Sequence, residues 1–275
     1  MDIPFLTFIG AGNMASSLIG GLVERGHPAD YIMACDPLGD YLERMQHRFG
    51  ILTSTDNING AARADVLVLA VKPQILEMVC RELRGHIDHK PLVVSIAAGV
   101  PVASLAEWLG DDLPLVRCMP NTPSLLQQGA SGLFANDVVD EEQRQQAEGI
   151  MASVGIVEWV RSEDEIDAVT ALSGSGPAYY FLFMEIMEKI GIELGLDPQV
   201  ARRLTRQTAL GAARMGAAEN VEVAELRRQV TSPGGTTEQA IESFMANNLE
   251  QVFRDAMGAA KQRARDMAQE GQPPA

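Results

Sequence analysis

Short apolar runs alternate with amphipathic segments along residues 1 to about 160. The runs are rich in Val, Leu and Ile, which is typical of strands that are buried on both faces of a parallel sheet. We expect strands at residues 5–9, 31–35, 51–53, 65–71, 92–96, 115–119, 132–135 and 157–160. Because strands and helical segments alternate, the pattern predicts an α/β fold with a mostly parallel, doubly wound sheet.

The pattern changes after this region, and no later segment has the pattern of a strand. Apolar residues recur at helical spacing, and we expect helices at residues 178–194, 198–218, 223–228, 236–246 and 249–269. The sequence therefore predicts two domains, an α/β domain of residues 1–162 and an all-helical domain of residues 163–275.

The expected helix at residues 178–194 is apolar on nearly all sides in its first half. Its apolar residues are Tyr179, Tyr180, Phe181, Leu182, Phe183, Met184, Ile186, Met187, Ile190 and Leu194. A helix that is apolar all round is buried on all sides. In so small a domain, we expect a partner subunit to cover it; the alternative is a central position in a monomeric helical bundle.

The first expected strand runs directly into a glycine-rich turn that opens a helix, with the sequence GAGNMA at residues 10–15. In a G-x-G-x-x-A pattern, Gly10 permits the tight turn, Gly12 permits close approach of a phosphate, and Ala15 permits close packing of helix on strand. The second strand ends at Asp36, where a ribose-binding acid belongs. The combination predicts a Rossmann-like dinucleotide-binding domain with the pyrophosphate at the helix N-terminus.

Further candidate residues follow later strands. Lys72 and Pro73 come after the run at 65–71, and small residues including Ala98 follow the strand at 92–96. The carboxyl ends of parallel strands form the edge at which such sheets bind ligands. The loop at 120–123 carries two polar side chains, Asn121 and Thr122, between two prolines at the same edge. For Lys72, an ordinary solvated lysine is the alternative.

Two loops in the helical part are candidates for binding a small anion. Residues 173–177 read SGSGP and residues 231–237 read TSPGGTT, and each precedes an expected helix. Glycines free the backbone to turn its N–H groups toward a carboxylate, and Thr237 adds a hydroxyl group. The alternative for the first loop is a tight helix start without a ligand.

Neither loop contains a His or Lys that would act as a general acid or base. A dehydrogenase that acts on a hydroxyl group needs such a residue to move the hydroxyl proton. An imine needs less, because its nitrogen is basic enough to arrive protonated and hydride then adds to the iminium carbon. The loops therefore favour imine reduction, with catalysis by orientation and desolvation.

Charge and composition narrow the choice of partners. A net charge of -15 argues against a general nucleic-acid or acidic-membrane binder. No apolar run reaches transmembrane length, and the first strand begins at Phe5, which leaves no room for a signal peptide. On these grounds we expect a cytoplasmic protein with a small-molecule substrate.

The cysteines and histidines carry no expected chemistry. Cys35, Cys80 and Cys118 lie inside apolar segments, as reduced core thiols do. The four histidines lie in expected loops or on polar faces without the spacing of metal ligands. We therefore expect no metal site.

Five motifs, in order along nearly the whole chain, resemble pyrroline-5-carboxylate reductase. They are FIGAGNMA (8–15), LAVKP (69–73), RCMPNTP (117–123), DAVTALSGSGPAY (167–179) and TSPGGTT (231–237). The resemblance implies reduction of 1-pyrroline-5-carboxylate to L-proline by NADPH or NADH, the last step of proline biosynthesis. It also implies a helical domain that interlocks into a homodimer, often within a ring of dimers.

The resemblance also assigns residues. Thr237 falls where the family has a threonine that hydrogen-bonds the ring nitrogen, which makes it the expected catalytic residue. The expected substrate-binding residues are Ser175, Ser232, Pro233, Gly234, Gly235 and Thr236. The expected cofactor-binding residues are Ile9, Gly10, Ala11, Gly12, Asn13, Met14, Asp36, Asn57, Ala70, Lys72, Pro73 and Ala98.

Asp36 bears on the choice between the two cofactors. Members of the family that use NADPH commonly present Ser or Arg to the 2′-phosphate, whereas this chain has Asp36 there. Two like charges about 4 Å apart repel by roughly 4 kcal/mol at an effective dielectric constant near 20. Asp36 therefore favours NADH, unless it turns away and Arg44 or Arg48 receives the phosphate.

Two other functions are compatible with parts of the pattern. A related reductase acting on another imine or on an open-chain keto acid is one, but a keto-acid reductase needs a lysine at the start of the helix at 178–194. Lys189 lies about three turns along that helix. A nucleotide-binding regulatory protein without catalysis is the other, and the intact SGSGP and SPGGTT loops argue against it.

Overall fold

The computed structural model describes residues 3–218 and 221–270. It divides into two compact units. The first contains the chain up to Ser175 together with the segment from Ala260, and the second contains residues Gly176–Ala259. From the sequence we expected the cofactor-binding domain to end at residue 162 and the substrate-binding helical domain to begin at residue 163. This domain boundary stays a prediction.

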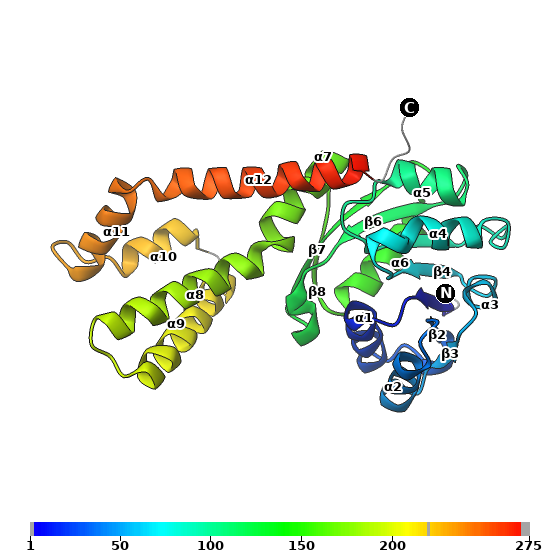
Figure 1. The fold of residues 1–275 in the computed structure, drawn as a ribbon, viewed down its shortest axis with the longest axis horizontal. Helices are drawn as coiled ribbons and strands as arrows, with labels where there is room; N and C mark the ends of the chain where they lie inside the picture. The colour runs from blue at the N-terminus through cyan, green and yellow to red at the C-terminus, as the bar shows by residue number, and fades with distance from the viewer. Residues whose placement is uncertain (1–2, 219–220, 271–275) are drawn as a thin grey trace. The chain divides into compact units, whose positions relative to one another are not determined.

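The first unit is built on an eight-stranded sheet with the order β3-β2-β1-β4-β5-β6-β7-β8 (Figure 1). The strands are β1 (Leu6–Ile9), β2 (Ile32–Cys35), β3 (Leu52–Ser54), β4 (Val66–Leu69), β5 (Leu92–Ser95), β6 (Leu115–Met119), β7 (Gly129–Ala135) and β8 (Gly155–Trp159). All neighbouring pairs are parallel except β6 and β7. The expected mostly parallel Rossmann-like sheet is confirmed.

The register aligns the strand ends that matter for binding. Ile9, the last residue of β1, pairs with Cys35 at the end of β2 and with Leu69 at the end of β4. The segments that leave these strands therefore start side by side at the carboxyl edge of the sheet.

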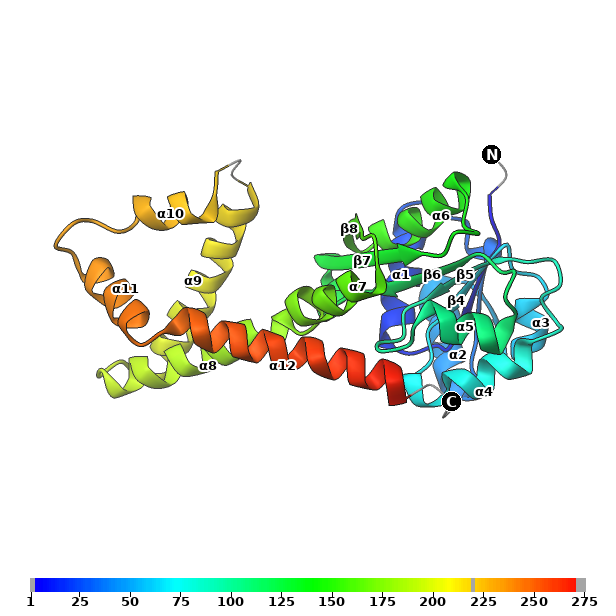
Figure 2. The same ribbon diagram turned by 90° about the horizontal axis from the view of Figure 1, so that it is seen from above.

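Helices cover both faces of the sheet. The helices α1 (Asn13–Glu24), α2 (Gly39–Phe49) and α6 (Glu141–Ala152) pack on one face, where their buried residues share a core with β1 residues such as Phe8. The helices α3 (Asn57–Ala61), α4 (Pro73–Leu83) and α5 (Val102–Leu109) pack on the other, around residues such as Ile9. Figure 2 shows α6 on one side of the sheet and α4 and α5 on the other.

A buried charge network fixes α7 (Glu163–Val169) to β6. Arg117 of β6 is only 2% exposed, and it donates to Asp167 at 3.1 Å and to Glu163. Glu163 also accepts the Val102 N–H at 2.7 Å. A buried charge destabilises the fold unless it is paired. These ion pairs therefore fix the position of α7 relative to the sheet.

The thiols of the first unit are buried and free, as expected. Burial raises the pKa of Cys35 and of Cys80 to about 12 and raises the pKa of Cys118 as well. These cysteines are thus protonated and unreactive at neutral pH.

The second unit is helical. It contains α8 (Gly176–Glu193), α9 (Pro198–Ala218), α10 (Val223–Gln229), α11 (Thr236–Ala246) and the first part of α12 (Leu249–Glu270). The bounds of α9 and α11 are those expected from the sequence. None of the helices within residues 3–218 and 221–270 has the length and apolar content needed to cross a lipid bilayer.

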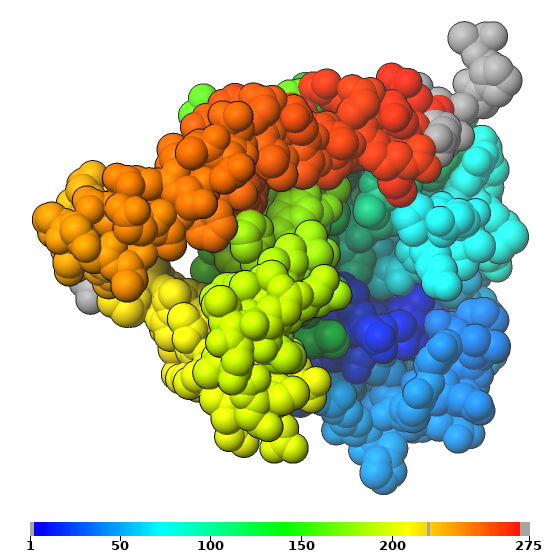
Figure 3. Space-filling model, turned by 60° about the vertical axis from the view of Figure 1, so that its left-hand side comes forward, coloured from blue at the N-terminus to red at the C-terminus, as the bar shows by residue number. Residues whose placement is uncertain are grey.

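The apolar helix α8 is exposed within a single chain. Tyr180 is 70% exposed and Phe181 is 63% exposed, and the space-filling view shows α8 (yellow-green) at the surface (Figure 3). The aromatic rings of Phe183 and Phe253 stack on each other, with their centroids 5.6 Å apart. These exposures exclude a central position of α8 in a monomeric bundle, the alternative considered above.

Candidate functional site

The glycine turn (residues 10–15) adopts a backbone conformation that requires glycine at its first position. Gly10 has φ +101°, and a Cβ there would lie 2.8 Å from the carbonyl oxygen of Ala70. Its N–H donates to the Cys35 carbonyl at 2.7 Å. The turn therefore passes directly over the ends of β2 and β4, where sequence analysis placed the cofactor.

The N-terminus of α1 is suited to an anion. Gly12 is the N-cap residue, and no side chain caps this end of the helix in the described structure. Gly12 and Asn13 are exposed, and a Cβ at Gly12 would meet nothing within 4 Å. The first N–H groups of the helix and its positive dipole end thus face open space that a phosphate can enter.

Asp36 is fixed beside this turn. One carboxylate oxygen accepts the Ala11 N–H at 2.9 Å and the other accepts the Leu38 N–H at 2.9 Å. The side chain is half-buried. Its negative charge thus lies next to the glycine turn, in the position expected of a ribose-binding acid.

A cavity of about 1080 Å³ joins the glycine turn to α2. Residues 11–13 line one side, and Asp40, Arg44 and Arg48 are among the charged residues that line the other. The Arg44 guanidinium lies 4.6 Å from the centre of the Tyr41 ring. The cavity therefore offers both positive charge and an aromatic surface within the same unit as the glycine turn.

The remaining expected cofactor residues lie at strand ends or in the first turns of α1 and α3. Ala70 donates its N–H to the Ile9 carbonyl at 2.8 Å, so these two residues join β1 to β4. Ile9 is fully buried and its side chain belongs to the core, so that only its backbone borders the turn. Met14 is half-buried against the core, and Asn57 is the first residue of α3, which Asp56 caps.

Lys72 is exposed and is the N-cap of α4, with Pro73 as the first helical residue. Pro73 and Ala98 line a second cavity of about 320 Å³. Gly99 lines it too, and a Cβ at Gly99 would lie 2.8 Å from the Met267 Cβ of α12. The last turns of α12 are thus packed against the loop that follows β5.

The SGSGP segment follows α7 through a π-helical turn, Thr170–Gly174. The Ser175 N–H donates to the Thr170 carbonyl at 2.8 Å, an i to i−5 bond that is frequent at functional sites. Ser175 is half-buried. Sequence analysis placed Asn121 at the carboxyl edge of the sheet without a specific role, and its amide donates to the Ser173 carbonyl at 3.0 Å.

The expected substrate loop, residues 231–237, lies in the second unit. It turns at Gly234, which has φ +73°, and the Gly235 N–H donates to the Ser232 carbonyl at 3.0 Å. Pro233 is exposed within the turn. The carboxylate of Glu238 accepts the Gly234 N–H at 2.7 Å, so that this loop already holds a carboxylate through its backbone.

Thr236 and Thr237 begin α11, and Gly235 caps it without a side-chain bond. The N–H groups at these first positions have no acceptor within the helix. The hydroxyl of Thr237, which is half-buried, stands beside them. The start of α11 can therefore bind a carboxylate while the Thr237 hydroxyl forms a hydrogen bond with a neighbouring atom.

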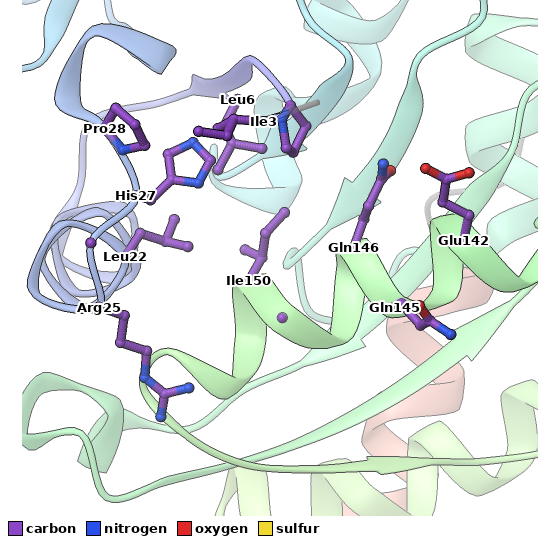
Figure 4. Close-up of a pocket in the computed structure, with 13 residues that line it drawn as sticks. Ile3, Leu6, Leu22, Arg25, His27, Pro28, Glu142, Gln145, Gln146 and Ile150 are labelled. Carbon is purple, nitrogen blue, oxygen red and sulfur yellow. The ribbon is translucent and has the colours of Figure 1, made fainter. Parts of the chain in front are cut away.

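A third cavity, of about 490 Å³, lies at the opposite edge of the sheet (Figure 4). It is lined by residues that include Leu6, Leu22, His27 and Ile150. Burial lowers the pKa of His27, so its imidazole is neutral at pH 7. Leu6 begins β1 whereas Gly10 follows its end, so this cavity is separate from the glycine turn.

The described residues contain no group of three or more His, Cys, Asp or Glu side chains placed to bind a metal ion. The predicted site residues instead supply backbone N–H groups, hydroxyls, two side-chain amides, the ammonium group of Lys72 and one carboxylate. Such a set binds anions and orients a substrate, and it contains no imidazole that would act as a general acid.

Two families match the chain in succession. The family described as NADP oxidoreductase, coenzyme F420-dependent, matches residues 6–99. The family described as pyrroline-5-carboxylate reductase dimerisation matches residues 163–267. The first match contains the glycine turn and Asp36, and the second contains the SGSGP and TSPGGTT loops.

Individual relatives match over the whole length. The chain is 53% identical over 270 residues to the pyrroline-5-carboxylate reductase of Pseudomonas aeruginosa, which covers 98% of this chain and 99% of the relative. It is 45% identical over 268 residues to that of Vibrio alginolyticus, with coverage of 97% and 98%.

Solved structures match as well. A pyrroline-5-carboxylate reductase from Coxiella burnetii has a TM-score of 0.94 and 47% identity, covering 97% of this chain and 99% of that one. A pyrroline carboxylate reductase from Plasmodium falciparum, solved with NADP bound, has a TM-score of 0.84 and 28% identity, covering 98% and 99%.

The two glycines of the turn are expected to respond differently to alanine. Gly10→Ala places a side chain at positive φ against the Ala70 carbonyl, so we expect it to destabilise the first unit by about 1–3 kcal/mol. Gly12→Ala leaves the fold nearly as stable but blocks close approach of a phosphate, so we expect weaker NADPH binding. Denaturant unfolding and fluorescence titration measure the two effects; NADPH binding unchanged in Gly12→Ala would contradict this placement.

Proposed function

The chain belongs to the pyrroline-5-carboxylate reductase family, and on that premise we propose how its residues carry out the reaction. The enzyme reduces the cyclic imine 1-pyrroline-5-carboxylate to L-proline with NADPH or NADH, the last step of proline biosynthesis. The observation that carries this conclusion is the 53% identity to a reductase of that name over 98% of the chain.

We propose that the glycine turn and the strand ends around it bind the cofactor. Gly10 allows the turn, and the open N-terminus of α1 at Gly12 accepts the pyrophosphate through N–H groups of Asn13 and Met14. The other cofactor-binding residues of this proposal are Ile9, Ala11, Asp36, Asn57, Ala70, Lys72, Pro73 and Ala98. The absence of a side-chain cap on α1 supports this placement.

The substrate carboxylate binds at the start of α11 in this proposal. Residues 232–236 form the turn that leads into the helix, and the bond between Gly234 and Glu238 supports the view that this loop binds carboxylates. Ser175 contributes a hydroxyl from the segment before α8. The carboxylate needs no lysine in this proposal, since the dipole of α11 provides the positive potential.

A nicotinamide cofactor bound at this site would supply the hydride that reduces the imine carbon. The ring nitrogen keeps the proton with which it arrived, so no residue has to donate one. Thr237 holds that nitrogen by a hydrogen bond and orients the C=N plane. The protein therefore accelerates the reaction mainly by positioning and by excluding water.

The choice of cofactor depends on charges around the glycine turn. We propose that Asp36 favours NADH, because its carboxylate is held beside the turn by the Ala11 N–H. Arg44 and Arg48 line the same cavity and offset part of this charge, so NADPH is accepted too.

We propose further that the helical unit interlocks with that of a second chain and that the dimers assemble into a ring. The match to a dimerisation family and the exposed apolar surface of α8 support this assembly. A cytoplasmic location is also proposed, and the three free, buried cysteines support it because such thiols persist in reducing compartments.

The role of Thr237 is tested by two substitutions. Thr237→Ala removes the hydrogen bond to the ring nitrogen, and we expect kcat for pyrroline-5-carboxylate to fall by about 10²–10³-fold with a smaller change in KM. Thr237→Ser keeps the hydroxyl and should retain most of the activity. Wild-type kinetics in Thr237→Ala would rule out this role, and a wild type without turnover would rule out the reaction itself.

The role of Asp36 is tested by the ratio of kcat/KM values for NADPH and NADH. Asp36→Ser removes the charge that opposes a 2′-phosphate, so we expect the ratio to shift toward NADPH by about tenfold or more. Asp40→Asn, which removes a charge from the same cavity, serves as the control. Equal shifts in both variants would mean that Asp36 has no specific contact with the ribose.

The dimer is tested by dilution. Because α8 exposes Tyr180 and Phe181 in a single chain, separated subunits should lose helical structure and activity together. Sedimentation and circular dichroism across a dilution series measure this coupling. A folded, fully active monomer would refute the interlocked dimer.

A further inference from the structure

Asn121 occupies a place where its side chain would normally cap a helical turn. It precedes the 3₁₀ turn η2 (Thr122–Leu126) as the N-cap residue, a position at which Asn is strongly preferred. No side-chain capping bond is formed there. Asn121 is only 9% exposed, so its amide must be satisfied by other groups.

The amide instead joins two segments that are distant in sequence. Its Oδ1 accepts the Ala130 N–H of β7 at 2.9 Å, and its Nδ2 donates to the Ser173 carbonyl at 3.0 Å. One partner is a donor and the other an acceptor, which fixes the orientation of the amide group. Asn121 therefore ties the end of β6 to β7 and to the π turn.

The chemistry of residue 177 explains why Ser173 needs this donor. In a continuous helix, the carbonyl of Ser173 accepts the N–H of the fourth residue after it, which is Pro177. Proline has no N–H, and its ring crowds the carbonyl four residues before it. The Asn121 amide thus provides the hydrogen bond that Pro177 removes.

The end of β6 also packs closely against the π turn. A Cβ at Gly174 would lie 2.5 Å from the Met119 Cε at the end of β6. The Ser173 hydroxyl also donates to the Val169 carbonyl at 3.2 Å, within the turn. Residues 173–174 are therefore held from the sheet side by the loop that follows β6.

We propose that Asn121 is a positioning residue for the reduction, which acts by fixing Ser173 and Gly174 and thereby aiming Ser175 at the substrate. The inference rests on the proposed substrate-binding role of Ser175. Asn121 itself touches neither substrate nor cofactor in this proposal. Its effect is transmitted through the Ser173 carbonyl alone.

Asn136 provides a matched control at the other end of the same strand pair. Its Oδ1 accepts the Leu115 N–H at 3.1 Å and its Nδ2 donates to the Leu113 carbonyl at 2.9 Å. Asn121→Ala and Asn136→Ala thus each remove one donated and one accepted bond between side chain and backbone. Only Asn121→Ala removes a hydrogen bond to the π turn.

We expect Asn121→Ala to lower kcat/KM for pyrroline-5-carboxylate by about 10²-fold, the scale of a small misplacement of a binding group. The dissociation constant of NADPH should stay unchanged, since the glycine turn is not involved. Asn136→Ala should lower the unfolding temperature comparably and leave kcat/KM near the wild-type value. Equal kinetic losses in both variants, or wild-type kinetics in Asn121→Ala, would overturn the proposal.

Two further variants isolate the bond to Ser173. Asn121→Asp keeps the acceptor for Ala130 but replaces the amide donor by a second acceptor, which repels the Ser173 carbonyl oxygen, so it should show at least the kinetic loss of Asn121→Ala. Pro177→Ala restores a helical donor, and in that background Asn121→Ala should lower the unfolding temperature less. If Asn121→Ala lowers the unfolding temperature by the same amount in both backgrounds, the Ser173 carbonyl is not the partner through which Asn121 acts.

Ser175→Ala separates this inference from the proposed function. Wild-type kinetics in Ser175→Ala would remove the substrate-binding role of Ser175 and with it the proposed target of Asn121. Reduced kcat/KM in Ser175→Ala together with wild-type kinetics in Asn121→Ala would keep that role and overturn positioning by Asn121.

Discussion

The close approach of Gly10 to the carbonyl of Ala70 is the constraint on which the cofactor site depends. It holds the glycine turn directly over the ends of β2 and β4, so that α1 starts at the carboxyl edge of the sheet. A protein with a net charge of -15 can bind an anionic cofactor here because the potential comes from local N–H groups and a helix dipole.

The same physical device occurs at the start of α11, in the other unit. There the loop at 231–235 turns the backbone toward a carboxylate, and the bond from Gly234 to Glu238 is an internal example of such binding. In the function that we propose, the start of α1 binds the cofactor phosphates and the start of α11 binds the substrate carboxylate. Imine reduction suits this arrangement, because orientation of a protonated C=N group needs hydrogen bonds rather than an acid of matched pKa.

Much of the fold could be predicted because local signals agree with tertiary structure. The strand at 115–119 and the helices at 198–218 and 236–246 were predicted with the bounds observed, since proline flanks the strand on both sides and Pro198 and Gly235 mark the starts of the two helices. Asp36 was placed correctly at the tip of β2 by the length of the first βαβ unit. The hydrogen bond from the Ala11 N–H to the Asp36 carboxylate depends on the geometry of the glycine turn, which a sequence pattern does not specify.

The parts that could not be predicted depend on contacts between distant residues. The network of Arg117 with Glu163 and Asp167 spans about fifty residues, and the bond of Asn121 to Ser173 is similar in span. No local sequence feature marks Glu163 or Asp167 as a partner of Arg117. Pro177 was a signal for the bond of Asn121 to Ser173, since a proline that follows SGSG leaves a carbonyl in need of a donor. The assignments of Asn57, Ala70 and Thr237 came from family resemblance rather than from pattern.

The most direct test of the account compares pyrroline-5-carboxylate with 1-pyrroline, the same imine without its carboxylate. If the start of α11 binds that group through two or more charge-assisted hydrogen bonds, kcat/KM should fall by about 10²–10⁴-fold for 1-pyrroline. The loss should shrink in a Gly234→Ala/Gly235→Ala variant, whose loop can no longer turn toward the substrate. Equal kcat/KM values for the two imines in the wild type would contradict the account.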